Sequence, residues 1–324
     1  MSDDAGGRVR LRIDPWAAEY DGAQGQLDLD EPAAAVDVAV ERADWTALRP
    51  ATDGAHPKLV FVDGVRRIDC RFVAEDGDRR RPGLFGSFAV GAVESGGAAT
   101  LLAWRTGRVA AVTRGLPVPA LTVQVGGSGL RWSPEVALDD TPDAPLRVLQ
   151  NAMRRAEAEL AATVADAAAA VIVDGPLTAG LPRGPFLGYV KRLLRGYLPE
   201  PQAALLPRMQ PGERTPLFAI AGPPLDRFSW YLRLAHGRAI DSDLAGVVRC
   251  ECALDLGLDA ARALADLAAR ELPRFASDAL RDARAPQNLF PIGALETALR
   301  HRLGEPLLLR RALEAAVAGA HGHA

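Results

Sequence analysis

Two short apolar runs, each followed by Asp-Gly, restrict the possible folds of this chain most strongly. Leu59–Val62 leads into Asp63-Gly64. Farther along the chain, Ala169–Val173 leads into Asp174-Gly175. Uninterrupted apolar runs of this length are typical of strands that are covered on both faces. Asp-Gly is a turn signal, so the chain is expected to turn away where each strand ends. The pattern predicts a sheet with helices packed against it.

The spacing of apolar residues separates strands from helices in the rest of the chain. Leu146, Leu149 and Met153 begin a stripe with steps of three and four that continues to Val164, which predicts an amphipathic helix between the two runs. No helical period fits the residues between the first run and this helix. Further strands are expected at 68–73, 84–93, 100–104, 109–113, 217–221, 230–234 and 246–253, and further helices at 33–45, 185–195, 259–272, 292–303 and 306–317.

Turn-forming residues mark the start of the main domain. Residues 52–57, Thr-Asp-Gly-Ala-His-Pro, combine several turn formers, and the chain before them lacks clear periodicity. We therefore expect an N-terminal extension at 1–55, a main domain at 56–317 and a disordered tail at 318–324. The order of strands, helix and strand in the main domain indicates an α/β fold with a mixed sheet and a helical C-terminal segment.

Charge and cysteine content exclude several classes of protein. The 324 residues contain 38 Lys and Arg against 41 Asp and Glu, which excludes a uniformly basic nucleic-acid coat but permits a local basic groove. No run of about 18 apolar residues is present, so no membrane span is expected. The acidic start lacks the apolar region of a secretory signal, and three cysteines without CxxC spacing fit a reducing compartment. We therefore expect a cytoplasmic protein.

The two strand ends are the strongest candidates for a functional site. Ligands of open α/β sheets bind at the carboxyl ends of the strands, so Asp63 and Asp174 are expected to meet in one cleft. Hard cations such as Mg²⁺ and Mn²⁺ prefer oxygen ligands, and a pair of carboxylates suits them. The simpler interpretation, that each Asp-Gly is only a turn after a strand, stays open for either one taken alone.

A third acid can come from the helix between the two strands. Glu157 lies roughly 60° from the centre of the apolar stripe of that helix, and Glu159 roughly 100° from it. Glu157 is therefore expected to reach towards the sheet edge, and Glu159 to face water. A solvated surface charge is the alternative interpretation for both, and it is favoured for Glu159.

Two arginines close to the first strand end are candidates for phosphate contacts. Arg66 and Arg67 follow Asp63 at a distance of three and four residues. Contacts to backbone phosphates supply most of the non-specific affinity of DNA-binding proteins. We expect both guanidinium groups to help to hold DNA.

Together these segments resemble the NurA nuclease family, whose ground plan is that of RNase H-like nucleases. The resemblance covers about residues 58–305, and its segments follow one another in the family's order. The segments are Phe61-Val-Asp63-Gly64, Met153-Arg-Arg-Ala-Glu157, Val171-Ile-Val-Asp174-Gly175-Pro-Leu177, Leu187-Gly-Tyr-Val-Lys191, Val248-Arg249-Cys-Glu251 and Pro286-Gln-Asn-Leu-Phe290-Pro291.

The resemblance implies a fold, an activity and partners. The fold would be an RNase H-like mixed sheet flanked by helices, and the activity a metal-dependent DNA nuclease for DNA end processing and double-strand break repair. Two Mn²⁺ or Mg²⁺ ions would be held by Asp63, Asp174 and Glu157. Lys191 or Arg66 would neutralise the scissile phosphate. A homodimer and a partnership with a HerA-like hexameric ATPase are also implied.

Two departures from the family pattern leave alternatives open. Val65 follows Asp63-Gly64 where the family commonly has Ser. The family's C-terminal histidine has no direct counterpart here, and either Glu296 or His301 is a candidate for its role. Helical phase favours Glu296, roughly 60° from the buried stripe of the C-terminal helix, over His301, roughly 160° from it. A catalytically impaired adaptor of a HerA-like ATPase is therefore the alternative to a nuclease.

Overall fold

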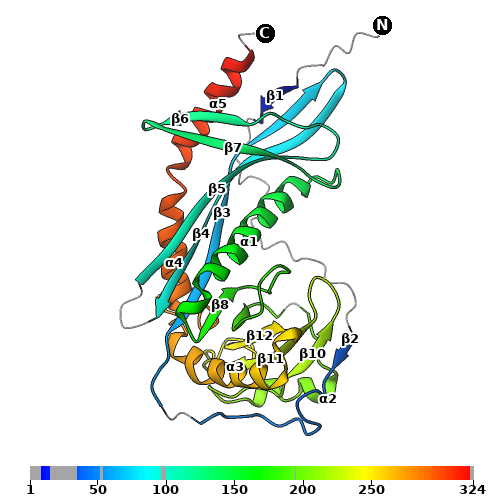
Figure 1. The fold of residues 1–324 in the computed structure, drawn as a ribbon, viewed down its shortest axis with the longest axis vertical. Helices are drawn as coiled ribbons and strands as arrows, with labels where there is room; N and C mark the ends of the chain where they lie inside the picture. Colours follow the sequence, from blue (N-terminus) through cyan, green and yellow to red (C-terminus); the bar gives the residue numbers. More distant parts are fainter. Residues whose placement is uncertain (1–8, 15–34, 52–53, 96–99, 194, 322–324) are drawn as a thin grey trace.

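The computed structural model describes residues 9–14, 35–51, 54–95, 100–193 and 195–321. Twelve strands in these ranges form a mixed sheet in the order β2-β10-β11-β12-β9-β8-β3-β4-β5-β7-β6, with β1 paired to β3. Helices cover the sheet (Figure 1), so the expected mixed α/β fold is confirmed. The narrower expectation of an RNase H-like topology stays a prediction.

Long antiparallel strands form one half of the sheet. β3 (Leu59–Asp76), β4 (Arg79–Ser95) and β5 (Thr100–Val112) lie side by side in the upper part of the view in Figure 1. At one end, β5 continues into the β6–β7 hairpin, and the N-terminal strand adds to β3. These three shorter strands are β6 (Leu121–Val125), β7 (Ser128–Val136) and β1 (Arg10–Ile13).

Shorter strands form the other half. β8 (Ala170–Asp174) lies parallel to β3, and β9 (Phe186–Val190) lies parallel to β8. The remaining strands are antiparallel to their neighbours: β12 (Val247–Ala253), β11 (Arg227–Arg233), β10 (Phe218–Ala221) and β2 (Ala35–Asp37). In this half only the β3–β8–β9 part is parallel, and it lies at the middle of the strand order; in the other half β7 also lies parallel to β5.

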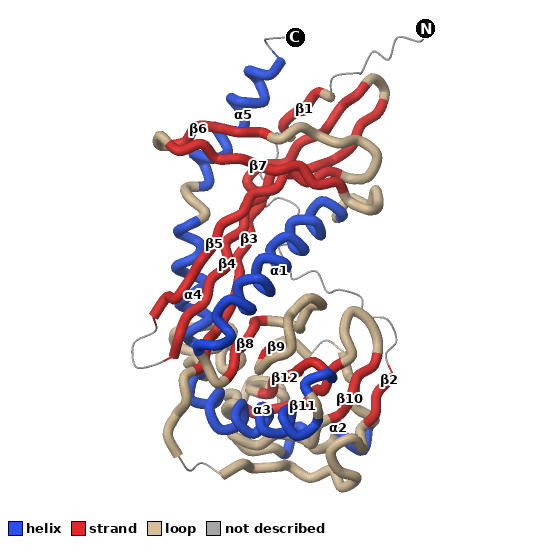
Figure 2. The backbone as a smooth tube through the Cα atoms, in the orientation of Figure 1, coloured by secondary structure: helices blue, strands red, loops and turns tan. Residues whose placement is uncertain are grey.

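Successive side chains of β3 point to opposite faces of the sheet, and each face packs against different helices. Val60 and Val62 pack with α1 (Ala144–Val164), whose buried stripe is the predicted one. Leu59 and Phe61 pack with α4 (Phe290–Arg302) and α3 (Leu258–Glu271) on the opposite face. Figure 2 shows α1 and α4 on either side of the long strands. β3 is therefore covered on both faces, as its uninterrupted apolar run indicates.

The last helix and one short helix complete the fold. α5 (Pro306–His321) packs against β6, β1 and β3, and α2 (Glu200–Ala203) is a single turn. The expected disordered tail begins inside α5, so residues 318–321 are helical, and 322–324 lie outside the described residues. In the expected extension at 1–55, β1 and β2 belong to the sheet. None of the described helices is long and apolar enough to cross a membrane.

The predicted turn at Asp63-Gly64 is wrong. β3 continues through both residues to Asp76, because β4 pairs with it along this whole length and satisfies its backbone groups. Only the pairing with β8 stops at this point, at Val62. The glycine has a packing reason: a Cβ atom on Gly64 would collide with Glu157 Oε1 and lie against Met153.

Two predicted helices are strands in the structure. The expected helix at 185–195 is β9 over Phe186–Val190, because these residues pair between β8 and β12. The expected helix at 33–45 is β2 over Ala35–Asp37, followed by turns, and residues 33–34 lie outside the described residues. Val36 packs against the apolar cluster around Phe218 and Tyr231. In both segments sheet pairing outweighs the helical propensity of the local sequence.

Candidate functional site

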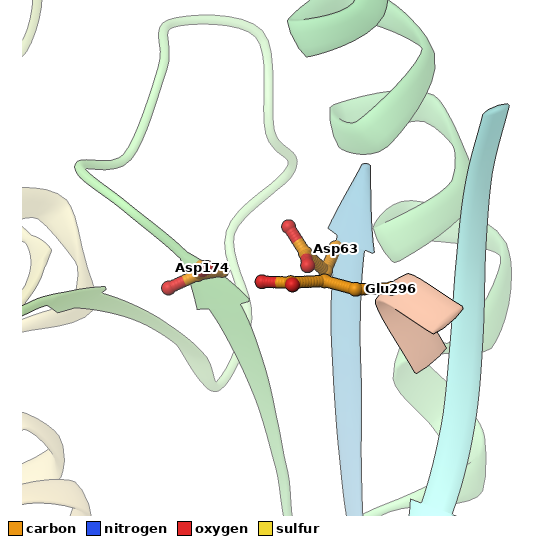
Figure 3. A group of neighbouring side chains, drawn as sticks. All are labelled: Asp63, Asp174 and Glu296. Carbon is orange, nitrogen blue, oxygen red and sulfur yellow. The ribbon is translucent and has the colours of Figure 1, made fainter. Parts of the chain in front are cut away.

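Three carboxylates from three different elements converge at the point where the paired strands β3 and β8 separate. Asp63 lies within β3, Asp174 ends β8 and Glu296 lies on α4. One oxygen of each lies within 4.8 Å of the others, and Figure 3 shows Asp63 and Glu296 extending towards the end of β8, where Asp174 lies. We call Asp63, Asp174 and Glu296 the carboxylate group.

Strand register accounts for the first two members. β3 and β8 are parallel and pair from Leu59 with Ala170 to Val62 with Val173. The next residue of each strand is an aspartate, so the two carboxylates lie at the same level where the strands separate. Gly175 has a φ of 99°, which allows the chain to leave the sheet directly after Asp174.

Packing of α4 accounts for the third member. Leu295 and Leu299 are buried, and both lie against Gly91 of β4, where a larger residue would push the helix away. β4 pairs Gly91 with Asp63, so α4 is docked at the level of the first aspartate. Glu296 follows Leu295 and is held at the border of the buried stripe, as helical phase predicts.

Two oxygens of the carboxylate group, Asp63 Oδ2 and Asp174 Oδ1, are buried and have no hydrogen-bond partner among the residues that the structure describes. The other oxygens are satisfied: Asp63 Oδ1 accepts a hydrogen bond from the backbone N–H of Gly64 at 2.7 Å, and Asp174 Oδ2 lies 2.7 Å from Lys191 Nζ. Burial, followed by the charge of Asp174, raises the pKa of Asp63 well above its usual range. Burial also raises the pKa of Asp174. Oxygens that are unpaired and costly to bury fit the donor set of a divalent cation.

A chain of polar contacts supports the carboxylate group on one side. Lys191 Nζ, already paired with Asp174, donates to Asn288 Oδ1 at 2.8 Å, and Asn288 donates in turn to Asp282. Arg284 makes two hydrogen bonds to Glu296, at 2.8 and 3.0 Å, and also pairs with Asp282. We call Lys191, Asp282, Arg284 and Asn288 the paired side, because its two cations, Lys191 and Arg284, each contact a member of the carboxylate group.

A cavity of about 640 Å³ includes the carboxylate group and extends towards α1. On this side it is lined by Arg66 from β3 and by Gln150, Arg154 and Glu157 from α1; we call these four residues the helix side. Among the described residues, the lining contains four carboxylates and six cationic side chains, namely Arg66, Arg154, Lys191, Arg192, Arg284 and Arg300. A cleft with both signs of charge suits an anionic ligand held beside a metal.

The structure agrees with the predicted orientation of the two acids on α1. Glu157 is buried and lines the cavity, whereas Glu159 is exposed and pairs with Arg105 at 3.4 Å. Glu157 is not a member of the carboxylate group of three. Burial raises its pKa to about 8, with a smaller contribution from the charge of Asp174.

Two other expected site residues lie away from the cavity lining. Arg67 pairs with Asp69 at 3.0 Å and donates to the backbone carbonyls of Leu303 and Gly304, where it holds the end of α4. His301 is exposed on α4 and does not line the cavity. Of the two candidates on the C-terminal helix, only Glu296 belongs to the carboxylate group.

Sequence reasoning missed several polar residues of the cavity, among them Gln150, Arg154 and Arg284. Gln150 and Arg154 lie four residues apart on α1, and Glu157 is three further on, so the helical spacing that selected Glu157 could also have selected them. Arg284 lies in an irregular segment before α4, where no periodicity connects it with Glu296. No local signal could have found that contact.

No family model and no curated protein matches the chain. Among solved structures, the chain is similar to the NurA nuclease from Sulfolobus solfataricus, with 11% sequence identity and a TM-score of 0.47. The match covers 86% of this chain and 88% of that one. A similarity this low establishes neither family nor activity, and the proposals below depend on the residues of the site.

Proposed function

We propose that this chain is a metal-dependent nuclease that hydrolyses phosphodiester bonds in DNA. The observation that carries the proposal is the pair of buried, unpartnered oxygens on Asp63 and Asp174, which lie beside Glu296 in a cavity lined with cations. The carboxylates suit a divalent cation, and the arginines suit a phosphate. The motif resemblance of the sequence points to the same chemistry.

Each residue has a role that follows from its position. Asp63, Asp174 and Glu296 would hold Mn²⁺ or Mg²⁺, and Glu157 would complete the ligands of a second ion. When bound, such ions activate water and stabilise the charge on the leaving oxygen. Glu157 keeps its proton near neutral pH in the metal-free protein, and a cation beside it would favour its carboxylate form. Lys191 neutralises Asp174 before a metal binds, and afterwards it is placed to face the scissile phosphate.

The biological setting is proposed from the motif resemblance. It comprises DNA end processing and double-strand break repair in the cytoplasm, a homodimer, and a HerA-like hexameric ATPase as partner. The adaptor alternative has one observation in its favour: Lys191 and Arg284 already neutralise two of the three carboxylates. An adaptor would keep this arrangement without binding a metal.

One experiment separates the two functions. Purified protein is incubated with end-labelled single- and double-stranded DNA in Mn²⁺, in Mg²⁺ and in EDTA, and its melting temperature is measured in parallel. A nuclease is expected to cleave DNA only with a metal, and the metal should raise the melting temperature because it binds the folded state. Absence of both effects would support the adaptor.

A further inference from the structure

The helix side of the cavity contains two arginines that no described carboxylate neutralises. Arg66 and Arg154 both line the cavity, and neither forms an ion pair with a described residue. Arg66 lines the cavity and donates through Nε to Gln150 Oε1. Their neighbours in sequence behave differently, because Arg67 pairs with Asp69 and Arg155 pairs with Glu135 at 3.0 Å.

Arg154 adds an unsatisfied donor. Its Nη1 atom is buried and has no hydrogen-bond partner among the described residues. Burial lowers the pKa of both guanidinium groups, and the charge of Arg154 lowers that of Arg66 further. A buried donor without an acceptor and two neighbouring like charges both oppose folding, so an anion between them would offset each cost.

We propose that Arg66 and Arg154 form a second phosphate-binding site in the cavity, separate from the carboxylate group, which holds the DNA strand beside the scissile bond. Gln150 orients Arg66 within it. The planar forks of two arginines match the geometry of phosphate oxygens and can bind them in a bidentate manner. Arg66 lies three residues beyond Asp63, about 10 Å along β3 and on the opposite face of the strand, but both residues line the same cavity. The phosphate held by Arg66 is therefore a neighbour of the scissile one.

The inference rests on the proposed DNA substrate, but its first test does not need catalysis. Inorganic phosphate is expected to raise the melting temperature of the wild-type protein in EDTA, because it binds the folded state. Arg154→Gln should lose this rise. Without phosphate the variant should melt close to wild type, since the substitution removes both the repulsion between Arg154 and Arg66 and the attraction between Arg154 and Glu157. An equal phosphate effect in wild type and variant would overturn the site.

The second test measures affinity for a labelled single-stranded oligonucleotide in EDTA, where no cleavage occurs. Arg154→Gln is expected to weaken binding about tenfold and to reduce the salt slope by about 0.7, the value for one lost phosphate contact on a single strand. Arg155→Gln is the matched control: it removes the same charge one residue away, where the side chain is exposed and paired with Glu135. Equal effects of the two substitutions would overturn the proposal.

The same assay identifies which phosphate occupies the site. If Arg154→Gln weakens binding equally for oligonucleotides with and without a 5′-phosphate, the occupant is an internal phosphodiester. If only the phosphorylated strand is affected, it is the terminal phosphate. Failure of the nuclease assay together with a retained, Arg154-dependent phosphate effect would contradict the proposed function and keep this site. Metal-dependent cleavage together with no effect of Arg154→Gln would support the proposed function and overturn this site.

Discussion

The two sides of the cavity use positive charge in different ways. On the paired side, Lys191 contacts Asp174 and Arg284 contacts Glu296, so each cation neutralises a carboxylate within the protein. On the helix side, Arg66 and Arg154 have no such partner among the described residues. Cations that are already paired hold the acids in place before a metal binds. Unpaired cations retain their donors for a ligand, so the two sides should respond to different ligands.

Asp63→Asn and Asp174→Asn should have the largest effect, because they remove the carboxylates that the paired side supports. If a bound cation supplies several kcal/mol of transition-state stabilisation, each substitution lowers the cleavage rate by about a thousandfold or more. Initial rates on labelled DNA in Mn²⁺ measure this. Asp63→Asn should melt no lower than metal-free wild type, because a buried like charge is removed, whereas Asp174→Asn also loses its ion pair with Lys191. Activity close to wild type in either variant would contradict the assignment.

Glu296→Gln should have the next largest effect. His301→Ala, on the same helix, is its control. Glu296 belongs to the carboxylate group, whereas His301 is exposed outside the cavity lining. We expect Glu296→Gln to lower Mn²⁺-dependent cleavage about 100-fold, less than the aspartates because Arg284 already neutralises this acid. His301→Ala should remain near wild type. If only the histidine variant lost activity, the catalytic role would move to His301.

Glu157 allows a test of the helix side without a ligand. Its folded-state pKa of about 8 lies above the ordinary 4.5, so the folded protein keeps a proton that the unfolded chain releases. Stability from this group is complete below pH 4.5 and is lost as the pH rises towards 8. In EDTA, the melting temperature of the wild type should therefore fall as the pH rises from 4.5 towards 8. Glu157→Gln should remove the part of this fall that comes from Glu157. Glu159→Gln, on the exposed face, should leave the profile unchanged; identical profiles for all three proteins would show that Glu157 is not buried as described.

Arg284→Gln should have the smallest effect and sharpens the contrast between the two sides. It removes a cation that competes with the metal for Glu296, so Mn²⁺ should bind more tightly. The guanidinium is half exposed, which limits the gain to about 1 kcal/mol, or about fivefold in affinity. Calorimetric titration with Mn²⁺ measures it, with Arg281→Gln as a control in the same segment. Weaker Mn²⁺ binding would mean that Arg284 supports the site instead of competing for it.

Local periodicity predicted the parts of the fold that depend on local geometry. Apolar residues at intervals of three and four identified α1, α3, α4 and α5, and the uninterrupted apolar runs identified β8 and the start of β3. The prediction failed at β9, where Phe186–Val190 is a strand because β8 and β12 lie on either side of it. Neither neighbour is close in sequence, so no local pattern records that pairing.

The same division holds within the site. Asp63, Asp174 and the phase of Glu157 could be predicted, because strand ends and helix faces follow from alternation and from the 3.6-residue period. The partners of the arginines could not be predicted. Arg66 and Arg67 are adjacent and alike in sequence, yet one lines the cavity and the other holds the end of α4. Alternating strand residues point to opposite faces, and only the helices packed there decide what each face contacts.

By itself, the sequence determined that an aspartate follows each of two buried apolar runs and that Glu157 lies at the border of the buried stripe of its helix, because these features need only local periodicity. Tertiary structure alone decided that β3 continues beyond Asp63, since β4, which places Gly91 opposite Asp63, supplies its hydrogen bonds. It also decided that Glu296 becomes the third carboxylate and that Arg284 is paired while Arg154 is not. Each depends on where separate elements dock, and docking is set by side-chain packing between segments far apart in the chain.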